Sequence, residues 1–202
     1  LPLATLGTFL LWFGWFGFNG GSQLAMGTAA DVAAISNIYI NTNLAAAGGV
    51  VVAIILTMLF YKKTDLTMAL NGALGGLVAI TAEPLAPTPM LAIFIGAVGG
   101  LIVVLTIPML VKFKIDDVVG AIPVHLFAGI WGTIAVVFSN SDATIGAQLY
   151  GIFAIGAFTI IASTIAWYVL KLVIGIRVTP EEEMEGMDIS EVGMEAYPDF
   201  RK

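Results

Sequence analysis

Long apolar runs dominate the sequence, and short polar or proline-rich segments separate them. Six runs stand out, each bounded by charged residues, Pro, Asn or Gly: residues 3–19, 35–61, 66–82, 90–111, 118–138 and 145–176. A helix needs about 20 apolar residues to cross the hydrocarbon core of a bilayer. The runs are continuous and lack the two-residue alternation of an outer-membrane strand. The pattern therefore predicts an all-α fold, a polytopic transmembrane bundle of about six helices.

The composition narrows the class of protein further. Of the 202 residues, 59% are hydrophobic and only 11% are charged, with a mean hydropathy of +0.99. Soluble domains carry roughly 25% charged residues, so a water-soluble globule is excluded. The chain has no cysteine for disulfides or thiolate metal sites, and its net charge of -6 argues against nucleic-acid binding. Because it starts at Leu1 without an initiator Met or a charged leader, we expect a truncated sequence.

The charged residues indicate how the predicted helices are oriented. The connections on one side of the predicted membrane carry Asp31, Glu83 and Asp142 but no Lys or Arg. All eight basic residues lie on the other side: Lys62, Lys63, Lys112, Lys114, Lys171, Arg177, Arg201 and Lys202. Basic residues mark the cytoplasmic side of membrane proteins. We therefore predict a multi-pass protein of the cell (inner or plasma) membrane, with both the start and the C-terminus of the chain in the cytoplasm.

The last segment, residues 178–202, differs in composition from the preceding transmembrane domain, residues 1–177. It is rich in Glu and Asp, which is typical of a solvated end. Apolar residues are interspersed along it, and they favour instead a segment that docks on another surface: Met184, Met187, Ile189, Val192, Met194 and Tyr197. We predict a cytoplasmic acidic regulatory tail.

Several residues have structural interpretations. The pairs Gly72 with Gly76 and Gly96 with Gly100 have the four-residue spacing at which small residues let helices approach closely. Acidic residues 116–117 precede the fifth run, and carboxylates there are expected to cap a helix start.

His125 is the only ionisable residue within a predicted span. Such residues are costly in a bilayer and are functional by default, and a neutral imidazole both donates and accepts hydrogen bonds. The alternative is a packed histidine bonded to a neighbouring helix. A lone histidine without Cys partners predicts no metal site. Asn71 and Thr81 are candidate pore-facing polar residues, and hydrogen bonds between helices explain them equally well.

Aromatic residues cluster at the end of the first run, with five among the seven residues 12–18. Helical spacing of three and four residues brings Trp15, Phe18 and Ser22 to one face. Aromatic faces attract desolvated cations by roughly 2 kcal/mol or more, and a hydroxyl accepts a hydrogen bond from a polar cation. The alternative is the aromatic belt of a membrane interface, which explains one or two such residues better than five.

Together these motifs resemble the Amt/Mep/Rh ammonium transporter family, in its bacterial or archaeal Amt branch. The matching segments are collinear along the chain: residues 12–22, 65–81, 116–132 and 175–198. The resemblance implies an eleven-span fold of which this chain matches spans six to eleven. It also implies a homotrimer with one pore per subunit.

By the same resemblance, four residues lie on a substrate pathway. Phe18 corresponds to one of two stacked phenylalanines at the outer mouth, and Trp15 to an aromatic residue that lines the pore. Ser22 corresponds to the hydroxyl of the outer recruitment site, and His125 to the second of two pore histidines.

The implied activity is transport rather than an enzymatic reaction, and it needs no cofactor. Ammonium is recruited at the aromatic vestibule and deprotonated, and ammonia passes the pore histidine. The implied partners are the bilayer and a PII-type signalling protein at the cytoplasmic face. Two alternatives stay open: an ammonium sensor or interaction module that signals through the tail, and a non-transporting fragment that needs a partner chain. We expect residues 1–202 alone not to transport.

Overall fold

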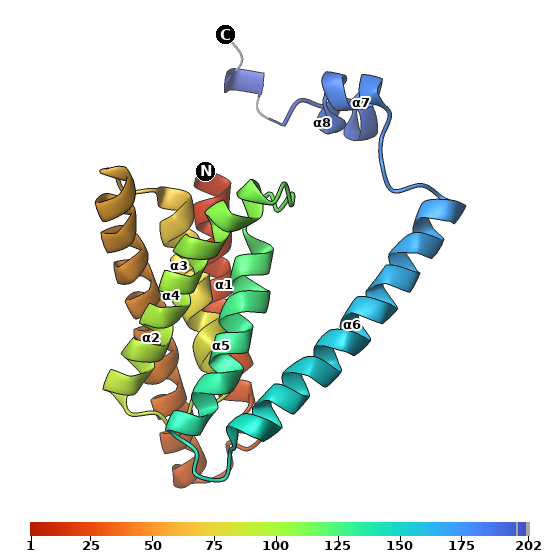
Figure 1. The fold of residues 1–202 in the computed structure, drawn as a ribbon. Coiled ribbons are helices and arrows are strands. Elements are labelled where there is room, and N and C mark those ends of the chain that lie inside the picture. The colour runs from red at the N-terminus through yellow and green to blue at the C-terminus, as the bar shows by residue number, and fades with distance from the viewer. Residues whose placement is uncertain (197, 201–202) are drawn as a thin grey trace. The chain divides into compact units, whose positions relative to one another are not determined.

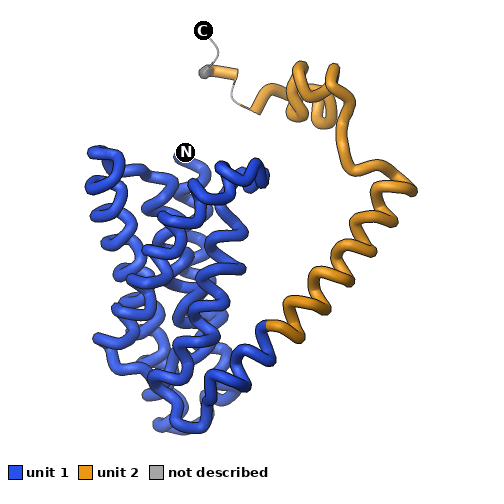
Figure 2. Tube along the Cα trace, viewed as in Figure 1, with its two compact units in different colours: residues 1–152 blue, residues 153–202 orange. Residues whose placement is uncertain are grey.

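The computed structural model describes residues 1–196 and 198–200, and it divides into two units, residues 1–152 and 153–202 (Figure 2). Every regular element of the described residues is a helix, which confirms the predicted all-α class. Tyr197, Arg201 and Lys202, which the sequence assigns to the tail, lie outside the described residues.

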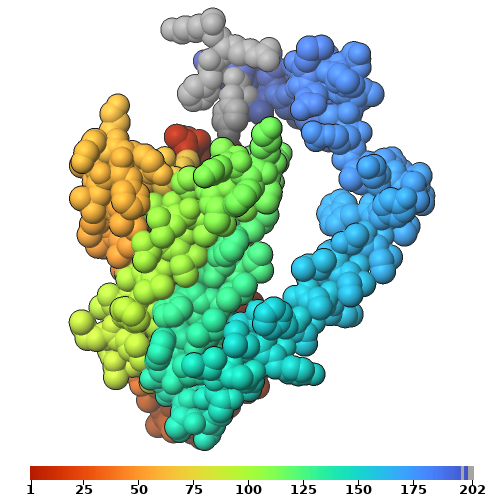
Figure 3. Space-filling view, viewed as in Figure 1, coloured from red at the N-terminus to blue at the C-terminus, as the bar shows by residue number. Residues whose placement is uncertain are grey.

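The first unit contains antiparallel helices joined by short loops (Figure 1). Its elements are α1 (Pro2–Gly21), α2 (Ala29–Tyr61), α3 (Leu66–Thr81), α4 (Pro89–Lys112), the π-helix η1 (Ile122–Phe127), α5 (Ala128–Ala135), the short η2 (Val136–Phe138) and the start of α6 (Ile145–Val173). Each predicted apolar run is therefore largely helical. Helices α2, α3 and α4 pack on one another, α1 contacts α2 and α3, and α4 lies beside α5 on the face seen in Figure 3.

Helix α2 begins at Ala29, six residues before the predicted position 35. A capping box accounts for the difference. The amide of Asp31 donates to the Thr28 hydroxyl at 3.1 Å, and the amide of Thr28 donates to the Asp31 carboxylate at 3.0 Å. Reciprocal bonds of this kind satisfy amide donors that the first turn leaves free. Asp31 thus belongs to the first turn of the helix rather than to the preceding link.

The predicted glycine pairs are sites of close helix contact. They face one stripe of α2, with Gly72 and Gly76 on α3 and Gly96 and Gly100 on α4. A Cβ atom at Gly72 would lie 2.8 Å from the carbonyl oxygen of Gly49, which a Cβ at Gly100 would also meet. The carbonyl of Ala45 blocks a Cβ at Gly76 and at Gly96 in the same way. Backbone atoms cannot yield as side chains do, so glycine at these positions sets the spacing of three helices.

The alternation of helix direction gathers the loop lysines of the first unit at one end. Residues 62–65 and 113–121 lie at the same end as the N-terminus (Figure 1). This end carries Lys62, Lys63 and Lys114, while Glu83 and Asp142 belong to the loops at the other end.

Three helices of the described chain, α2, α4 and α6, are long and apolar enough to cross a membrane, by length and composition. Residues 66–81 and 122–138 form shorter apolar helices. Helices of this kind place most of the first unit in a lipid environment.

The second unit contains the remainder of α6, the short helices α7 (Pro180–Glu185) and α8 (Met187–Val192), and η3 (Pro198–Phe200). A second capping box starts α7, because the amide of Thr179 donates to the Glu182 carboxylate at 2.8 Å and the Thr179 hydroxyl accepts from the Glu182 amide at 3.3 Å. The hydrogen bonds from the Thr179 amide and hydroxyl hold the pKa of Glu182 below its usual value. At least one acidic residue of the tail, Glu182, thus takes part in capping a helix.

Candidate functional site

His125 lies in the π-helix η1, which starts at Ile122 rather than at the predicted residue 118. The preceding turn is held by one carboxylate. Asp117 accepts hydrogen bonds from the amides of Gly120, Ala121 and Ile122, at 3.1, 2.9 and 2.8 Å. The turn also needs φ of +79° at Gly120, a conformation that glycine adopts without steric cost. Of the predicted pair 116–117, Asp117 therefore binds the amides at this helix start, just before the segment that bears the histidine.

The wider turn of a π-helix changes which residues share a face. One additional residue in a turn rotates the following side chains by about 100° relative to a regular α-helix. Such turns are frequent at functional sites. Here the turn joins directly to α5, and His125 lines one cavity together with Gly129 and Thr133 of that helix.

This cavity has a volume of about 610 Å³ and is the candidate functional site. Four elements contribute to its wall: Leu10, Leu11, Gly14, Trp15 and Phe18 from α1, Val78, Thr81 and Ala82 from α3 and its end, His125 from η1, and Gly129 and Thr133 from α5. Most of these side chains are apolar. Phe18 is 65% exposed and His125 is also exposed, so the cavity is open to the surroundings of this chain.

The orientation of Trp15 is fixed by a hydrogen bond between helices. Its indole N–H donates to the Thr81 hydroxyl at 2.7 Å, and that hydroxyl donates to the carbonyl of Leu77 at 2.6 Å. The ring of Trp15 also lies 6.0 Å from that of Phe18, at an interplanar angle of 52°. The two aromatic residues thus form one wall of the cavity, and Thr81 connects that wall to α3.

The structure brings together four of the six residues that the sequence singles out, namely His125, Trp15, Phe18 and Thr81. Ser22 is exposed near the end of α1, where its hydroxyl donates to the Phe18 carbonyl at 3.2 Å. Asn71 lies on α3 against the turn before His125, since a Cβ atom at Gly120 would be 3.1 Å from its Nδ2. Neither Ser22 nor Asn71 is among the residues that line the cavity.

Thr133 is a polar wall residue that the sequence interpretation does not include. Its hydroxyl donates to the Gly129 carbonyl at 2.9 Å. The available signal was the spacing of four and eight residues from His125, which keeps side chains near one helix face. Within a uniformly apolar run, that signal does not separate a wall residue from a packed one.

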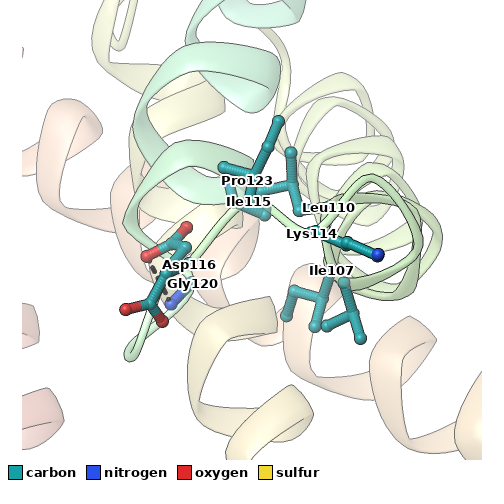
Figure 4. Close-up of a pocket in the computed structure, with 9 residues that line it drawn as sticks. Ile107, Leu110, Lys114, Ile115, Asp116, Gly120 and Pro123 are labelled. Carbon is teal, nitrogen blue, oxygen red and sulfur yellow. Dashed lines mark hydrogen bonds between the residues drawn. The ribbon is translucent and has the colours of Figure 1, made fainter.

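A second cavity of about 340 Å³ adjoins the turn held by Asp117 (Figure 4). Its wall combines apolar side chains with Lys114 and Asp116: the lining residues are Ile107, Leu110, Val111, Lys114, Ile115, Asp116, Asp117, Gly120 and Pro123. In the described part of the chain, no three residues of the types His, Cys, Asp and Glu gather as metal ligands would.

Comparison with known proteins identifies the family. The model of the Ammonium Transporter Family matches residues 1–197. This chain belongs to that ammonium transporter family. Family membership and apolar helices of spanning length make it a multi-pass membrane protein.

Its relatives in this family include ammonium transporters of archaea. The chain is 43% identical to Ammonium transporter Amt2 of Archaeoglobus fulgidus, over 99% of this chain and 46% of the relative. Identity to Ammonium transporter Amt1 of Haloferax mediterranei is 36%, over 98% of this chain and 41% of the relative. The chain thus spans about half the length of the curated relatives that it matches. These relatives are transporters rather than enzymes.

Solved structures of Amt and Rh proteins share the fold of this chain. A structure titled Sensor Amt Protein superposes with a TM-score of 0.86 at 37% identity, over 94% of this chain and 49% of the other. The Rh50 protein of Nitrosomonas europaea superposes with a TM-score of 0.73 at 27% identity, over 93% of this chain and 52% of the other. The helix arrangement is therefore one that Amt and Rh proteins have in common.

Proposed function

We propose that the protein carrying these residues transports ammonium or ammonia across a membrane, and that the 610 Å³ cavity forms part of the pathway. The observation that carries this proposal is the convergence of His125, Trp15 and Phe18 on one apolar cavity, in a chain of the ammonium transporter family. Transport rather than catalysis suits this site, because the wall hydroxyls of Thr81 and Thr133 donate to backbone carbonyls rather than to the imidazole of His125.

Desolvation of the cation is the physical problem that such a site has to solve. Moving a charge toward the centre of a bilayer is costly, and a cation at the face of an aromatic ring recovers roughly 2 kcal/mol or more. We assign recruitment to Phe18 and Trp15, with the Ser22 hydroxyl at the same end of α1 as a hydrogen-bond acceptor. Ammonium can then give up a proton, so the neutral molecule crosses the apolar region. Potassium has no proton to lose and is excluded by chemistry rather than by size.

His125 serves the neutral permeant in this proposal. An imidazole presents one donor and one acceptor when neutral, so it can hydrogen-bond ammonia without a net charge in the pathway. Asn71 is assigned a supporting role beside the turn that precedes His125, rather than direct contact with the permeant.

We further propose a homotrimer with one pathway per subunit and a cytoplasmic C-terminus. The basic residues at one end of the first unit support this orientation, because positive residues favour the cytoplasmic side. The capped short helix α7 in the tail supports a segment that docks at the cytoplasmic face, where a PII-type signalling protein would bind.

A second candidate function is sensing, in which ammonium binding is transmitted through the tail. The likeness to a structure titled Sensor Amt Protein favours it. Sensing predicts saturable ammonium binding that changes the protease sensitivity of residues 178–196, with no uptake of a labelled substrate. Transport predicts uptake whether or not the tail responds.

Uptake of radiolabelled methylammonium tests the proposal. Cells lacking their own ammonium transporters would express the native protein that contains this chain, or its His125→Ala variant. We expect the variant to lose most uptake or to lose its exclusion of potassium. Leu126→Ala is the matched control, because Leu126 is the next residue of the same π-helix and does not line the cavity. Equal uptake and equal potassium exclusion in all three proteins would refute the role of His125.

A further inference from the structure

The polar side chains of the cavity wall other than His125 all use their hydrogens in bonds within the protein. Apart from His125, three wall side chains carry polar hydrogens: Trp15, Thr81 and Thr133. Each hydrogen is directed to a partner inside the protein. The Trp15 indole donates to Thr81 at 2.7 Å, Thr81 donates to the Leu77 carbonyl at 2.6 Å, and Thr133 donates to the Gly129 carbonyl at 2.9 Å.

The side chains differ in what they still offer to a molecule in the cavity. An indole has one donor and no acceptor, whereas a hydroxyl has one donor and two lone pairs. With its N–H bound to Thr81, Trp15 presents only its aromatic faces. Thr81 keeps one lone pair after accepting from Trp15, and Thr133 keeps two. The wall beside His125 therefore presents acceptors and aromatic surface rather than donors.

We propose that Thr81 is a specificity-determining residue that acts by engaging the indole N–H of Trp15, so that the wall receives molecules that donate hydrogen bonds. This inference rests on the proposed transport function. Ammonium and alkylammonium ions carry only donors, and they fit a wall of lone pairs and aromatic faces. Anions require donors from the wall, and apart from His125 this wall does not supply them.

Thr81 is suited to this role by its position. It is the last residue of α3, and Trp15 lies on α1, so the bond joins two helices that each contribute to the wall. The second bond of Thr81, to the Leu77 carbonyl, directs its proton back along its own helix. That bond leaves the oxygen to accept from Trp15. A valine at this position would have nearly the same shape but would leave the indole N–H without a partner.

The test compares Thr81→Val, Thr81→Ser and the native sequence in the native protein that contains this chain. We expect Thr81→Val to raise the KM for methylammonium about tenfold, the effect of losing one hydrogen bond to a charged donor. The maximum rate should stay within about twofold, as expected when ground-state binding is lost. Thr81→Ser keeps the hydroxyl and should restore the native KM.

A spectroscopic measurement separates this role from a purely structural one. The ultraviolet resonance Raman band that reports indole N–H hydrogen bonding should shift toward a weaker bond in Thr81→Val and return in Thr81→Ser. The matched control is Thr106→Val on α4. Thr106 also donates to a carbonyl one turn earlier, that of Ile102, at 2.6 Å, but it is not a wall residue. It should leave both KM and the Raman band unchanged.

Each outcome has a defined meaning. A native KM in Thr81→Val, an unshifted Raman band, or a KM change that Thr106→Val reproduces would overturn the assignment of Thr81. A fall in maximum rate alone, with unchanged KM, would also overturn it, because that result indicates structural damage rather than altered binding. If the native protein takes up no methylammonium at all, the proposed transport function fails instead, which the uptake of the unaltered protein reports independently of the variants.

Discussion

Asn41 provides a quantitative test of how the proline-rich loop between α3 and α4 is held. Its side chain is 3% exposed, and its Nδ2 donates to the carbonyls of Pro84 and Pro87 at 3.0 and 2.8 Å. Proline lacks an amide hydrogen, so this loop has few donors with which to satisfy its own carbonyls. Both prolines are buried, which keeps water from substituting for the amide of Asn41.

The expected cost of Asn41→Ala follows from these contacts. Each hydrogen bond contributes about 0.5–1.5 kcal/mol net, and a buried carbonyl left without a partner costs about 1–3 kcal/mol. Two bonds set a lower bound of about 1 kcal/mol, and two orphaned carbonyls set an upper bound of about 6 kcal/mol. Between these bounds, we expect a loss of about 2–4 kcal/mol in unfolding free energy.

Thermal unfolding of the purified native protein in detergent measures this loss. Ser36→Ala is the control, because Ser36 is exposed on the same helix and its hydroxyl donates only to its own helix, at the Val32 carbonyl. We expect a clearly lower unfolding temperature for Asn41→Ala and faster proteolysis within residues 82–88. A melting curve that coincides with that of Ser36→Ala would refute the reasoning, since it would mean that the two carbonyls find other partners at no cost.

Two further predictions concern Asp117 and Asp65. Asp117→Asn removes the negative charge of the side chain that accepts hydrogen bonds from three amides before His125. We expect the imidazole to be displaced and methylammonium uptake to fall at least about tenfold. Asp116→Asn, which alters none of those bonds, is the control, and equal uptake in both variants would contradict the prediction. Hydrogen bonds from the Thr67 hydroxyl at 2.6 Å and the Met68 amide at 3.0 Å hold the pKa of Asp65 below its ordinary 3.8. A lowered folded-state pKa stabilises the fold above the unfolded-state value, and this contribution is lost as the pH falls through the folded-state value. The difference in melting temperature between the native protein and Asp65→Asn should therefore be largest near neutral pH and shrink below about pH 4, and a difference independent of pH would argue against it.

The helical elements could be predicted because their signals are local. A run of apolar residues or a four-residue glycine spacing is present in the chain itself. The first residues of the helices were harder to predict from the sequence. The start of α2 depends on the two hydrogen bonds that Thr28 and Asp31 exchange. In the sequence alone, Asp31 looks like part of a polar loop between two apolar runs. The late start of η1 depends in the same way on Asp117 and the positive φ of Gly120.

The residue type of His125 was enough to predict part of the candidate site, whereas other wall residues were evident only from their placement. His125 is conspicuous in any reading because it is a titratable residue in an apolar run. For Thr81 the sequence left a pathway role and a bond between helices equally open, and the structure shows its hydroxyl accepting from Trp15 while the residue lines the cavity. Thr133 carried no distinguishing signal, since a threonine bonded to its own helix is common in apolar helices.

The class of protein, the helices and the presence of close helix contacts can be predicted from the chain alone, because apolar length, scarce charge and glycine spacing are properties of a few consecutive helical turns. The packing of the helices sets which backbone atoms those glycines contact, at Ala45 and Gly49, and which side chains line one cavity. Trp15 and Thr81 are separated by 66 positions. Contacts of that separation depend on how whole helices pack, and no local pattern of residues specifies them.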